Sequence, residues 1–256
     1  ITKIAFNNND LITANGGGDG GKFTINYTGT GNTSNLVSGN SSYSYITFIT
    51  SGTLILNSSI TCDILCIGGG GGGSSGGGGA GHLVYLTNQN LNNGIYNITV
   101  GLGGSGKLAT TRGDDGNDSF IQLNGTDIVR AYKGGGGAPN TSLATAPNGI
   151  YGSLGGAGHD SGATYSTFSA GTVLGNLGAR ATNGISGSTG YQSAGGGGGA
   201  GGVGQIGIDG NFSDANSGAK GGDGGIGIQN SITGIATYYA GGGAGGTNIN
   251  KSTTTQ

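Results

Sequence analysis

Residues 68–81 read GGGGGGSSGGGGAG, and this stretch decides the fold. The chain has 256 residues, of which 66 are glycine. Further glycine-rich runs occupy residues 16–21, 101–106, 134–137, 155–158, 195–204, 218–227 and 241–246. Ordering a glycine in a regular element costs roughly 0.5–1 kcal/mol more than ordering an alanine. Runs on this scale therefore either stay unstructured or form a structure that only a residue without a Cβ atom can form.

The composition favours an ordered chain. Disordered segments combine a high net charge with few aromatic or β-branched residues, whereas this chain has a net charge of −2, 11 tyrosines and 6 phenylalanines. Collagen needs glycine at every third position and abundant proline, but the glycines here are consecutive and there are only 2 prolines. We expect most of the chain to be ordered and residues 249–256 to form a flexible tail.

Consecutive glycines can adopt the left-handed polyproline II helix, which has three residues per turn and no internal hydrogen bonds. The N–H and C=O groups of such a helix point outward and can pair with neighbouring helices, which satisfies the buried main chain. Side chains would separate the helices, so only small residues such as Ser74, Ser75, Ala80 and Ala200 can interrupt the runs. The sequence therefore predicts a packed array, or sandwich, of polyglycine II helices.

The other segments predict short antiparallel β-strands and essentially no α-helix, because no glycine-free stretch carries an apolar stripe at helical spacing. Residues 43–50 (YSYITFIT) alternate, with Ile46 and Phe48 on one face. Asn124-Gly125 predicts a hairpin between strands at 119–123 and 126–132. Further strands are expected at residues 3–6, 11–13, 22–27, 53–56, 60–67, 82–86 and 94–100. The predicted fold class is all-β with a polyglycine array.

Four regions are expected along the chain. Residues 1–44 form a β-rich N-terminal attachment or assembly segment, and residues 45–133 combine β-strands with the first glycine-rich region. Residues 134–248 form a polyglycine-helix region with variable loops, followed by the tail at 249–256. The chain begins at Ile1 and contains no methionine, which is expected of a processed product or a fragment.

Charge and cysteine spacing exclude several kinds of partner and cofactor. With 8% charged residues, the chain has no basic field for a phosphate backbone, so we predict no nucleic-acid partner. The apolar runs are far shorter than the ~20 residues that span a bilayer, so we predict no membrane insertion. Cys62 and Cys66 lie about 13 Å apart on a strand, which is too far for a disulfide. We expect two buried thiols, no metal and no cofactor.

Three short motifs resemble catalytic or ligand-binding signatures. Residues 101–106 fit G-x-G-x-x-G, but no helix pattern follows, so we expect no nucleotide site. Residues 72–76 fit the G-x-S-x-G nucleophile elbow, again without a helix. Residues 155–160 match the start of a calcium-binding repeat in a single copy, whereas such a site needs stacked copies. We therefore predict a protein that is not an enzyme.

Part of the chain resembles the glycine-rich domain of bacteriophage tail-fibre adhesins and related virus surface proteins, including those of giant viruses. The resemblance covers residues 45–137. It is carried by Phe48, Gly52, Ile67 to Gly73, Tyr96, Ile98, Val100 to Gly104, Gly113, Gly116, Ser119, Phe120 and Gly134 to Gly137. The stretch before Tyr43 has no counterpart in the pattern. The resemblance implies a sandwich of polyglycine helices whose connecting loops contact a host-cell receptor.

From these features we predict a non-enzymatic, extracellular or virion-surface protein, and most specifically a receptor-binding adhesin. Its partner would be a host-cell surface protein or glycan. The alternative is a self-assembling subunit of an extracellular filament, viral fibre or capsid decoration, whose N-terminal strands add to a neighbour's sheet. That alternative predicts other virion or fibre subunits, including further copies of the chain, as partners.

Residues with aromatic or imidazole rings near the variable segments are the candidate receptor contacts, because rigidly held rings give contact area at little entropic cost. They are Tyr151, His159, Tyr165, Phe168, Tyr191 and Phe212. The other role for each aromatic residue is to close the ends of the glycine array, and Tyr238 and Tyr239 are expected in the core. N-x-S/T triplets make Asn26, Asn32, Asn40, Asn57, Asn140 and Asn211 glycosylation candidates.

Overall fold

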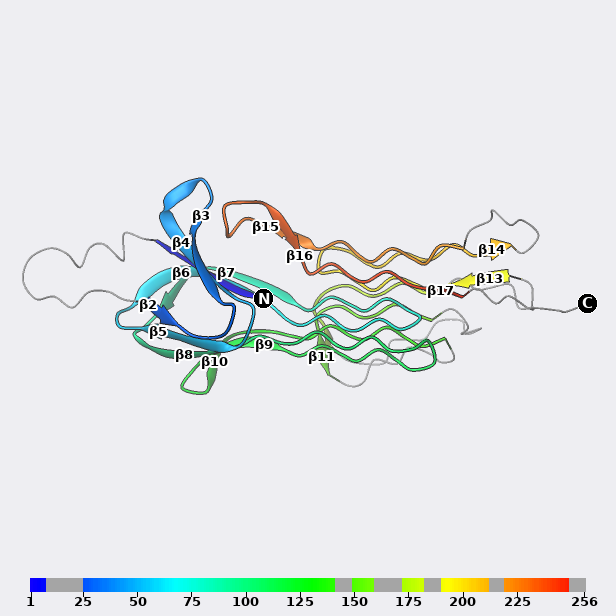
Figure 1. The fold of residues 1–256 in the computed structure, drawn as a ribbon, viewed down its shortest axis with the longest axis horizontal. Helices are drawn as coiled ribbons and strands as arrows, with labels where there is room; N and C mark the ends of the chain where they lie inside the picture. The colour runs from blue at the N-terminus through cyan, green and yellow to red at the C-terminus, as the bar shows by residue number, and fades with distance from the viewer. Residues whose placement is uncertain (8–24, 141–148, 159–171, 182–189, 212–218, 249–256) are drawn as a thin grey trace, which may run out of the picture.

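The computed structural model describes residues 1–7, 25–140, 149–158, 172–181, 190–211 and 219–248. These residues form strands and extended segments without any α-helix, so they include no helix that could cross a membrane. The strands β1 to β10, within residues 2–131, lie at one end of the molecule, and the glycine-rich segments run away from them side by side (Figure 1). The predicted all-β class is confirmed.

Two five-stranded sheets form the sheet end of the molecule. The first contains, in order across the sheet, β3 (Thr33–Val37), β4 (Asn40–Phe48), β1 (Thr2–Asn7), β6 (Ile60–Ile67) and β7 (Leu83–Leu91). The second contains β10 (Thr126–Ala131), β9 (Ser119–Leu123), β8 (Gly94–Thr99), β5 (Gly52–Leu56) and β2 (Ile25–Tyr27). Neighbouring strands in both sheets are antiparallel.

The smaller sheets lie in the second half of the chain. They pair β11 (Ile150–Tyr151) with β12 (Thr172–Val173), β14 (Gly210–Asn211) and β17 (Thr247–Asn248) with β13 (Gly190–Ser193), and β15 (Ile228–Asn230) with β16 (Thr237–Tyr239).

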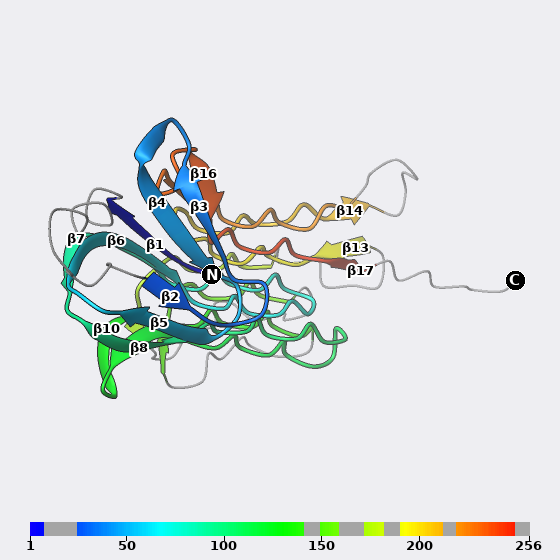
Figure 2. The same cartoon turned by 60° about the vertical axis from the view of Figure 1, so that its left-hand side comes forward.

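The hydrophobic core lies between the two large sheets. Ile4, Ile46 and Phe48 contribute to it from the first sheet, and Leu54 and Tyr96 from the second. Figure 2 shows the two sheets as separate layers. Both cysteines are buried and free, as predicted, and burial together with the neighbouring Asp63 raises the pKa of Cys62 to about 12.

The hairpin of β15 and β16 covers part of the outer face of the first sheet, where Ile232 and Tyr239 pack against Leu65 and Ala5. Tyr239 therefore belongs to the core region, as predicted. Tyr238 does not, because its side chain points away and is 65% exposed. Adjacent residues of a strand face opposite sides, so only one of the two tyrosines can contact the sheet.

The predicted Asn124-Gly125 hairpin is confirmed. Asn124 and Gly125 both have positive φ, at 52° and 79°, as a two-residue hairpin turn requires. The expected strand at 82–86 extends to Leu91, and the one at 11–13 lies outside the described residues.

Two of the boundaries between the expected regions fall inside structural elements. The one at 44/45 lies within β4, and β1 is a central strand, paired with β4 on one side and β6 on the other. Residues 1–7 are thus integrated into the first sheet, and an attachment role for residues 1–44 stays a prediction. The boundary at 133/134 lies within one glycine-rich segment, and residues 249–256 are outside the described part.

The glycine-rich segments pair through their main chains, and we call them together the glycine array. The array comprises residues 68–82, 101–107, 113–118, 133–140, 152–158, 174–179, 194–209, 219–227 and 240–246. Several strands continue directly into it, since β6 ends at Ile67 and β9 begins at Ser119.

Hydrogen-bond partners within the array recur at every third residue. Along 76–82, the N–H groups of Gly76, Gly79 and His82 donate to Ala138, Gly135 and Tyr132 at 2.9, 2.8 and 2.8 Å. Gly77 and Ala80, also three residues apart, donate to Gly195 and Gly198 at 3.1 and 2.9 Å. Three residues per turn is the repeat of a polyglycine II helix, and the pattern agrees with that prediction.

Candidate functional site

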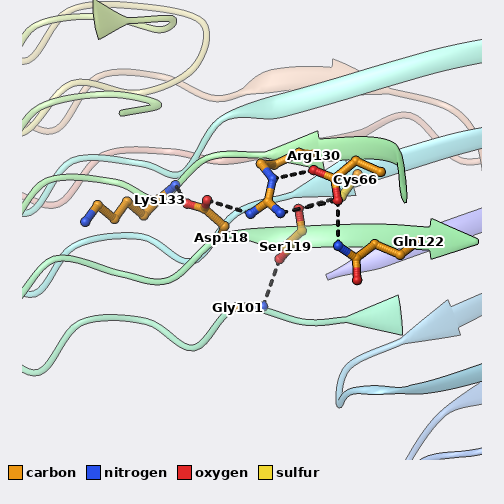
Figure 3. Close-up of polar contacts among 8 residues, drawn as sticks. Cys66, Gly101, Asp118, Ser119, Gln122, Arg130 and Lys133 are labelled. Atoms are coloured by element: carbon orange, nitrogen blue, oxygen red, sulfur yellow. Dashed lines mark hydrogen bonds and ion pairs between the residues drawn. The ribbon is translucent and has the colours of Figure 1, made fainter. Parts of the chain in front are cut away.

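The junction between the second sheet and the glycine array is built around Ser119. Its hydroxyl donates to the carbonyl of Ile67 at 2.7 Å and accepts the N–H of Gly101 at 2.9 Å. The carbonyl of Ser119 lies 3.5 Å from the Sγ atom of Cys66 (Figure 3). The side chain is fully buried. One small polar residue thus ties together three segments at the point where strands become glycine runs.

Arg130 organises the outer side of this junction. Its guanidinium donates to Asp118 at 3.0 Å (Figure 3) and to Asp127 at 2.6 Å. Asp118 also accepts the main-chain N–H of Lys133 at 3.0 Å. Hydrogen bonds from Arg130 and Gln122 lower the pKa of Asp127. Both carboxylates are therefore paired with Arg130, which suits a structural role better than proton transfer.

A groove of about 730 Å³ lies beside this cluster. It runs over the ends of β8, β9 and β10 and over the nearby glycine segments, with Phe120, Tyr132 and Asn117 among the residues that line it. Apolar side chains at its margin include Ile49, Leu102 and Ile150, which are 52%, 75% and 40% exposed.

Both aromatic rings of the groove stack on a neighbour. The Arg130 guanidinium lies 4.2 Å from the centroid of Phe120, and the His82 ring lies 6.3 Å from that of Tyr132 at an interplanar angle of 24°. Burial lowers the pKa of His82, and its Nδ1 atom is buried without a hydrogen-bond partner among the described residues. Its neutral ring is the form that this site accommodates.

Tyr151 is not a surface contact residue, which corrects its predicted role. Its side chain is fully buried, and its hydroxyl donates to Asp115 at 2.9 Å. Burial and the bond to this carboxylate raise the pKa of Tyr151 to about 12. Tyr151 instead packs in the interior with Leu154 and Val173.

Asp115 is the centre of this second polar cluster. It accepts the N–H of Gly136 at 3.0 Å and pairs with Arg112, besides its bond to Tyr151. Burial alone would raise the pKa of Asp115, but these hydrogen bonds and the Arg112 charge outweigh it and lower the pKa. From the sequence alone, Asp115 is only one of two adjacent acidic residues, Asp114 and Asp115, in a predicted turn. The spacing of Arg112 to Asp115 was the available signal, although its partner Tyr151 lies 36 residues away.

The remaining predicted contact residues are not brought together by the described structure. Tyr191 lies on β13 with its side chain outside the description, and His159, Tyr165, Phe168 and Phe212 lie outside the described residues. β13 and β14, which adjoin residues 182–189 and 212–218 in sequence, lie at the end of the array farthest from the two large sheets (Figure 1).

The glycosylation candidates lie in different environments. Asn26 and Asn57 are exposed, whereas Asn32 is half-buried. The Asn32 amide donates to the carbonyl of Thr28 at 2.7 Å and accepts the N–H of Ile49 at 2.9 Å, so it links two turns. The Oδ1 atom of Asn140 is buried without a hydrogen-bond partner among the described residues. The side chains of Asn40 and Asn211 are outside the description. Glycosylation at any of them stays a prediction.

Two of the three short motifs, residues 72–76 and residues 101–106, lie in the first array segments. Ser74 in the first motif and Lys107 directly after the second make structural contacts. Ser74 donates to the carbonyls of Leu108 and Thr111, at 3.1 and 2.7 Å. Lys107 forms an ion pair with Asp114 at 2.8 Å. The segment 101–107 is an extended part of the array, with no helix after it.

Comparison with known proteins places the chain in a family by its sequence. A search of curated proteins and a search of solved structures each find no match. A family model described as "Glycine-rich domain" matches residues 47–256, which is most of the chain. The match includes β5 to β10 and the whole glycine array. The chain therefore belongs to the glycine-rich domain family.

Proposed function

We propose that the chain is a non-enzymatic recognition protein of a virion surface or the cell exterior. In this proposal the glycine array is a stiff scaffold that holds variable segments away from the β-sheets. These segments bind a host-cell surface protein or glycan, as in a receptor-binding adhesin. The virion context rests on the resemblance of residues 45–137 to tail-fibre adhesins.

The observation that carries the proposal is the position of β13 and β14. Both strands end the array on the side opposite the two large sheets, and each adjoins a variable segment, 182–189 and 212–218 (Figure 1). Main-chain hydrogen bonds hold the array behind them together. Segment 76–82 alone forms such bonds with the segments around Gly71, Gly135, Gly156, Gly197 and Gly243. Recognition residues commonly lie on loops that a rigid scaffold positions.

Segment replacement tests this function. Residues 182–189 and 212–218 are replaced together by Gly/Ser linkers of equal length, and binding to intact candidate host cells is measured by flow cytometry. The control replaces the exposed turn at residues 57–59, which lies in the sheet end. We expect the distal replacement to abolish binding and the control to keep it, with both variants melting like the parent chain. Unchanged binding by the distal variant would refute the proposal.

A second candidate function is self-assembly into a fibre, and exposed aliphatic side chains on the array favour it. Val203, Ile206 and Ile226 are 54%, 56% and 66% exposed. Aliphatic side chains on an otherwise side-chain-poor lattice offer a contact surface between copies. The predicted route through the N-terminal strands is not available to β1, whose two edges are both paired. Light scattering after size exclusion separates the candidates, since open-ended polymer indicates the fibre.

A further inference from the structure

We propose that the groove at the sheet–array junction is a second binding site, specific for a neutral saccharide. This site lies on the outer side of the second sheet, at the opposite end of the array from β13 and β14. It is therefore separate from the distal segments that the proposed function uses. Its volume of about 730 Å³ lies within the range of roughly 300–1,000 Å³ that is usual for small-ligand sites.

The two aromatic rings are already fixed in place before any ligand arrives. Phe120 is stacked on Arg130, and Tyr132 is stacked on His82. Phe120 and Tyr132 line the groove, whereas their stacking partners Arg130 and His82 do not. Pre-stacked rings lose little conformational entropy on binding, and their faces suit the C–H-bearing faces of a sugar ring.

The hydrogen-bonding groups of the groove are neutral. Ser51 Oγ accepts the N–H of Val100 at 3.0 Å, which leaves its O–H available to donate. The Thr50 hydroxyl already donates to the carbonyl of Thr30 at 2.7 Å, so it can serve a ligand as an acceptor. The side-chain amide of Asn117 is exposed and makes no hydrogen bond within the described part of the chain, although its main-chain groups pair with Leu102 and Gly69. Hydroxyls and amides are donors and acceptors at once, which matches the hydroxyl groups of a sugar.

The charged residues that line the groove are already paired. Asp118 accepts hydrogen bonds from Arg130 and from the N–H of Lys133. The Lys133 ammonium lies 3.8 Å from Asp115 and 5.1 Å from the ring centroid of Tyr151. A charged ligand would have to displace these partners, because no unpaired charged side chain among the described residues lines the groove to bind an opposite charge on the ligand. The groove therefore favours an uncharged ligand.

Titration by NMR tests the site directly. Amide ¹H–¹⁵N spectra of the full chain are recorded with D-glucose, D-galactose, D-mannose and N-acetylglucosamine, each added separately. We expect at least one sugar to shift the amides of Leu102, Asn117 and Phe120 in a saturable way. The variant with replaced distal segments should show the same shifts, so that failure of the adhesin proposal and failure of this one are distinguishable.

Two substitutions and a matched control complete the test. Phe120→Ala removes one of the two rings. Asn117→Ala removes an exposed side-chain amide that makes no hydrogen bond to the described residues, so this variant should fold even if Phe120→Ala does not. We expect each to weaken binding by about tenfold. Tyr238→Ala removes an exposed ring outside the groove and should leave binding unchanged. Absence of saturable shifts with all four sugars would overturn the proposal, as would equal weakening by Tyr238→Ala. Shifts of the same amides only with an apolar peptide would also overturn it, by making the groove a peptide site.

Discussion

Gly78 shows why this chain needs glycine rather than another small residue. A Cβ atom added there would lie closer than 3.0 Å to the carbonyl oxygen of Gly71, a distance that real Cβ atoms essentially never show. Its own carbonyl accepts the N–H of Gly243. Main chains therefore approach each other over the space where a side chain would stand. At Gly70, eight residues earlier in the same run, the nearest atom would be 3.5 Å away, which is ordinary contact.

Gly78→Ala and Gly70→Ala together test this close approach, because both variants make the same substitution in the same glycine run. We expect Gly78→Ala to lower the free energy of unfolding by about 1–3 kcal/mol, because neighbouring backbone must move. Gly70→Ala should leave it unchanged or raise it by up to about 1 kcal/mol, because alanine restricts the unfolded chain. Urea denaturation followed by tyrosine fluorescence measures both. Equal effects of the two substitutions would contradict the close-packed array.

Ser119 gives a second prediction at the residue scale, since its buried hydroxyl satisfies the carbonyl of Ile67 and the part-buried N–H of Gly101. We expect Ser119→Ala to destabilise the chain by about 2 kcal/mol, because the N–H of Gly101 is left without its partner. Ser51→Ala removes a similar acceptor for the N–H of Val100 at an exposed position, where water replaces it. That control should change stability by at most about 0.5 kcal/mol. Thermal unfolding followed by circular dichroism compares the two.

At the scale of elements, Asp115 connects segment 113–118 to the segment 133–140 and to β11, through Gly136 and Tyr151. The folded pKa of this carboxyl lies below its ordinary value of 3.8. The stabilisation is therefore complete above the unfolded pKa and is lost as pH falls through the folded pKa. The ion pair of the adjacent Asp114 with Lys107 is far more exposed.

Acid titration of stability tests the Asp115 cluster. The melting temperature of the parent chain should fall between about pH 5 and about pH 2, as the carboxylate is protonated. Asp115→Asn should melt lower than the parent at neutral pH and should show a shallower fall in acid. Asp114→Asn should follow the parent curve. A parent-like curve for Asp115→Asn would show that the cluster does not stabilise the fold.

Local patterns in the sequence predict the strands and turns well. They do not predict features that depend on partners distant in the sequence. Asn124-Gly125 specified its hairpin because φ is positive at both residues, a purely local property. Alternation placed Ile46 and Phe48 in the core. The burial of Tyr151 depends on Asp115, and the central position of β1 depends on β4 and β6, which follow it by dozens of residues. Local patterns do not predict the groove either, because the residues that line it come from separate strands and array segments.

At the scale of the whole molecule, one feature links fold and function: the glycine array is held by main-chain hydrogen bonds between segments that are distant in sequence. Gly197 donates to Gly243, for example, and Gly243 to Gly78, both at 2.8 Å. A lattice of this kind can hold β13, β14 and the junction groove in fixed positions. A slack tether could hold none of these.

Hydrogen exchange of the glycine amides, followed by NMR in deuterated buffer, tests this claim most directly. The N–H groups of Gly77, Gly79 and Gly197 each donate to another array segment. We predict that they exchange at least about 1,000-fold more slowly than in an unstructured peptide. The exposed Gly106, whose N–H has no main-chain partner among the described residues, should exchange quickly and serves as the internal control. Exchange of all four amides at the rate of an unstructured peptide would contradict the account.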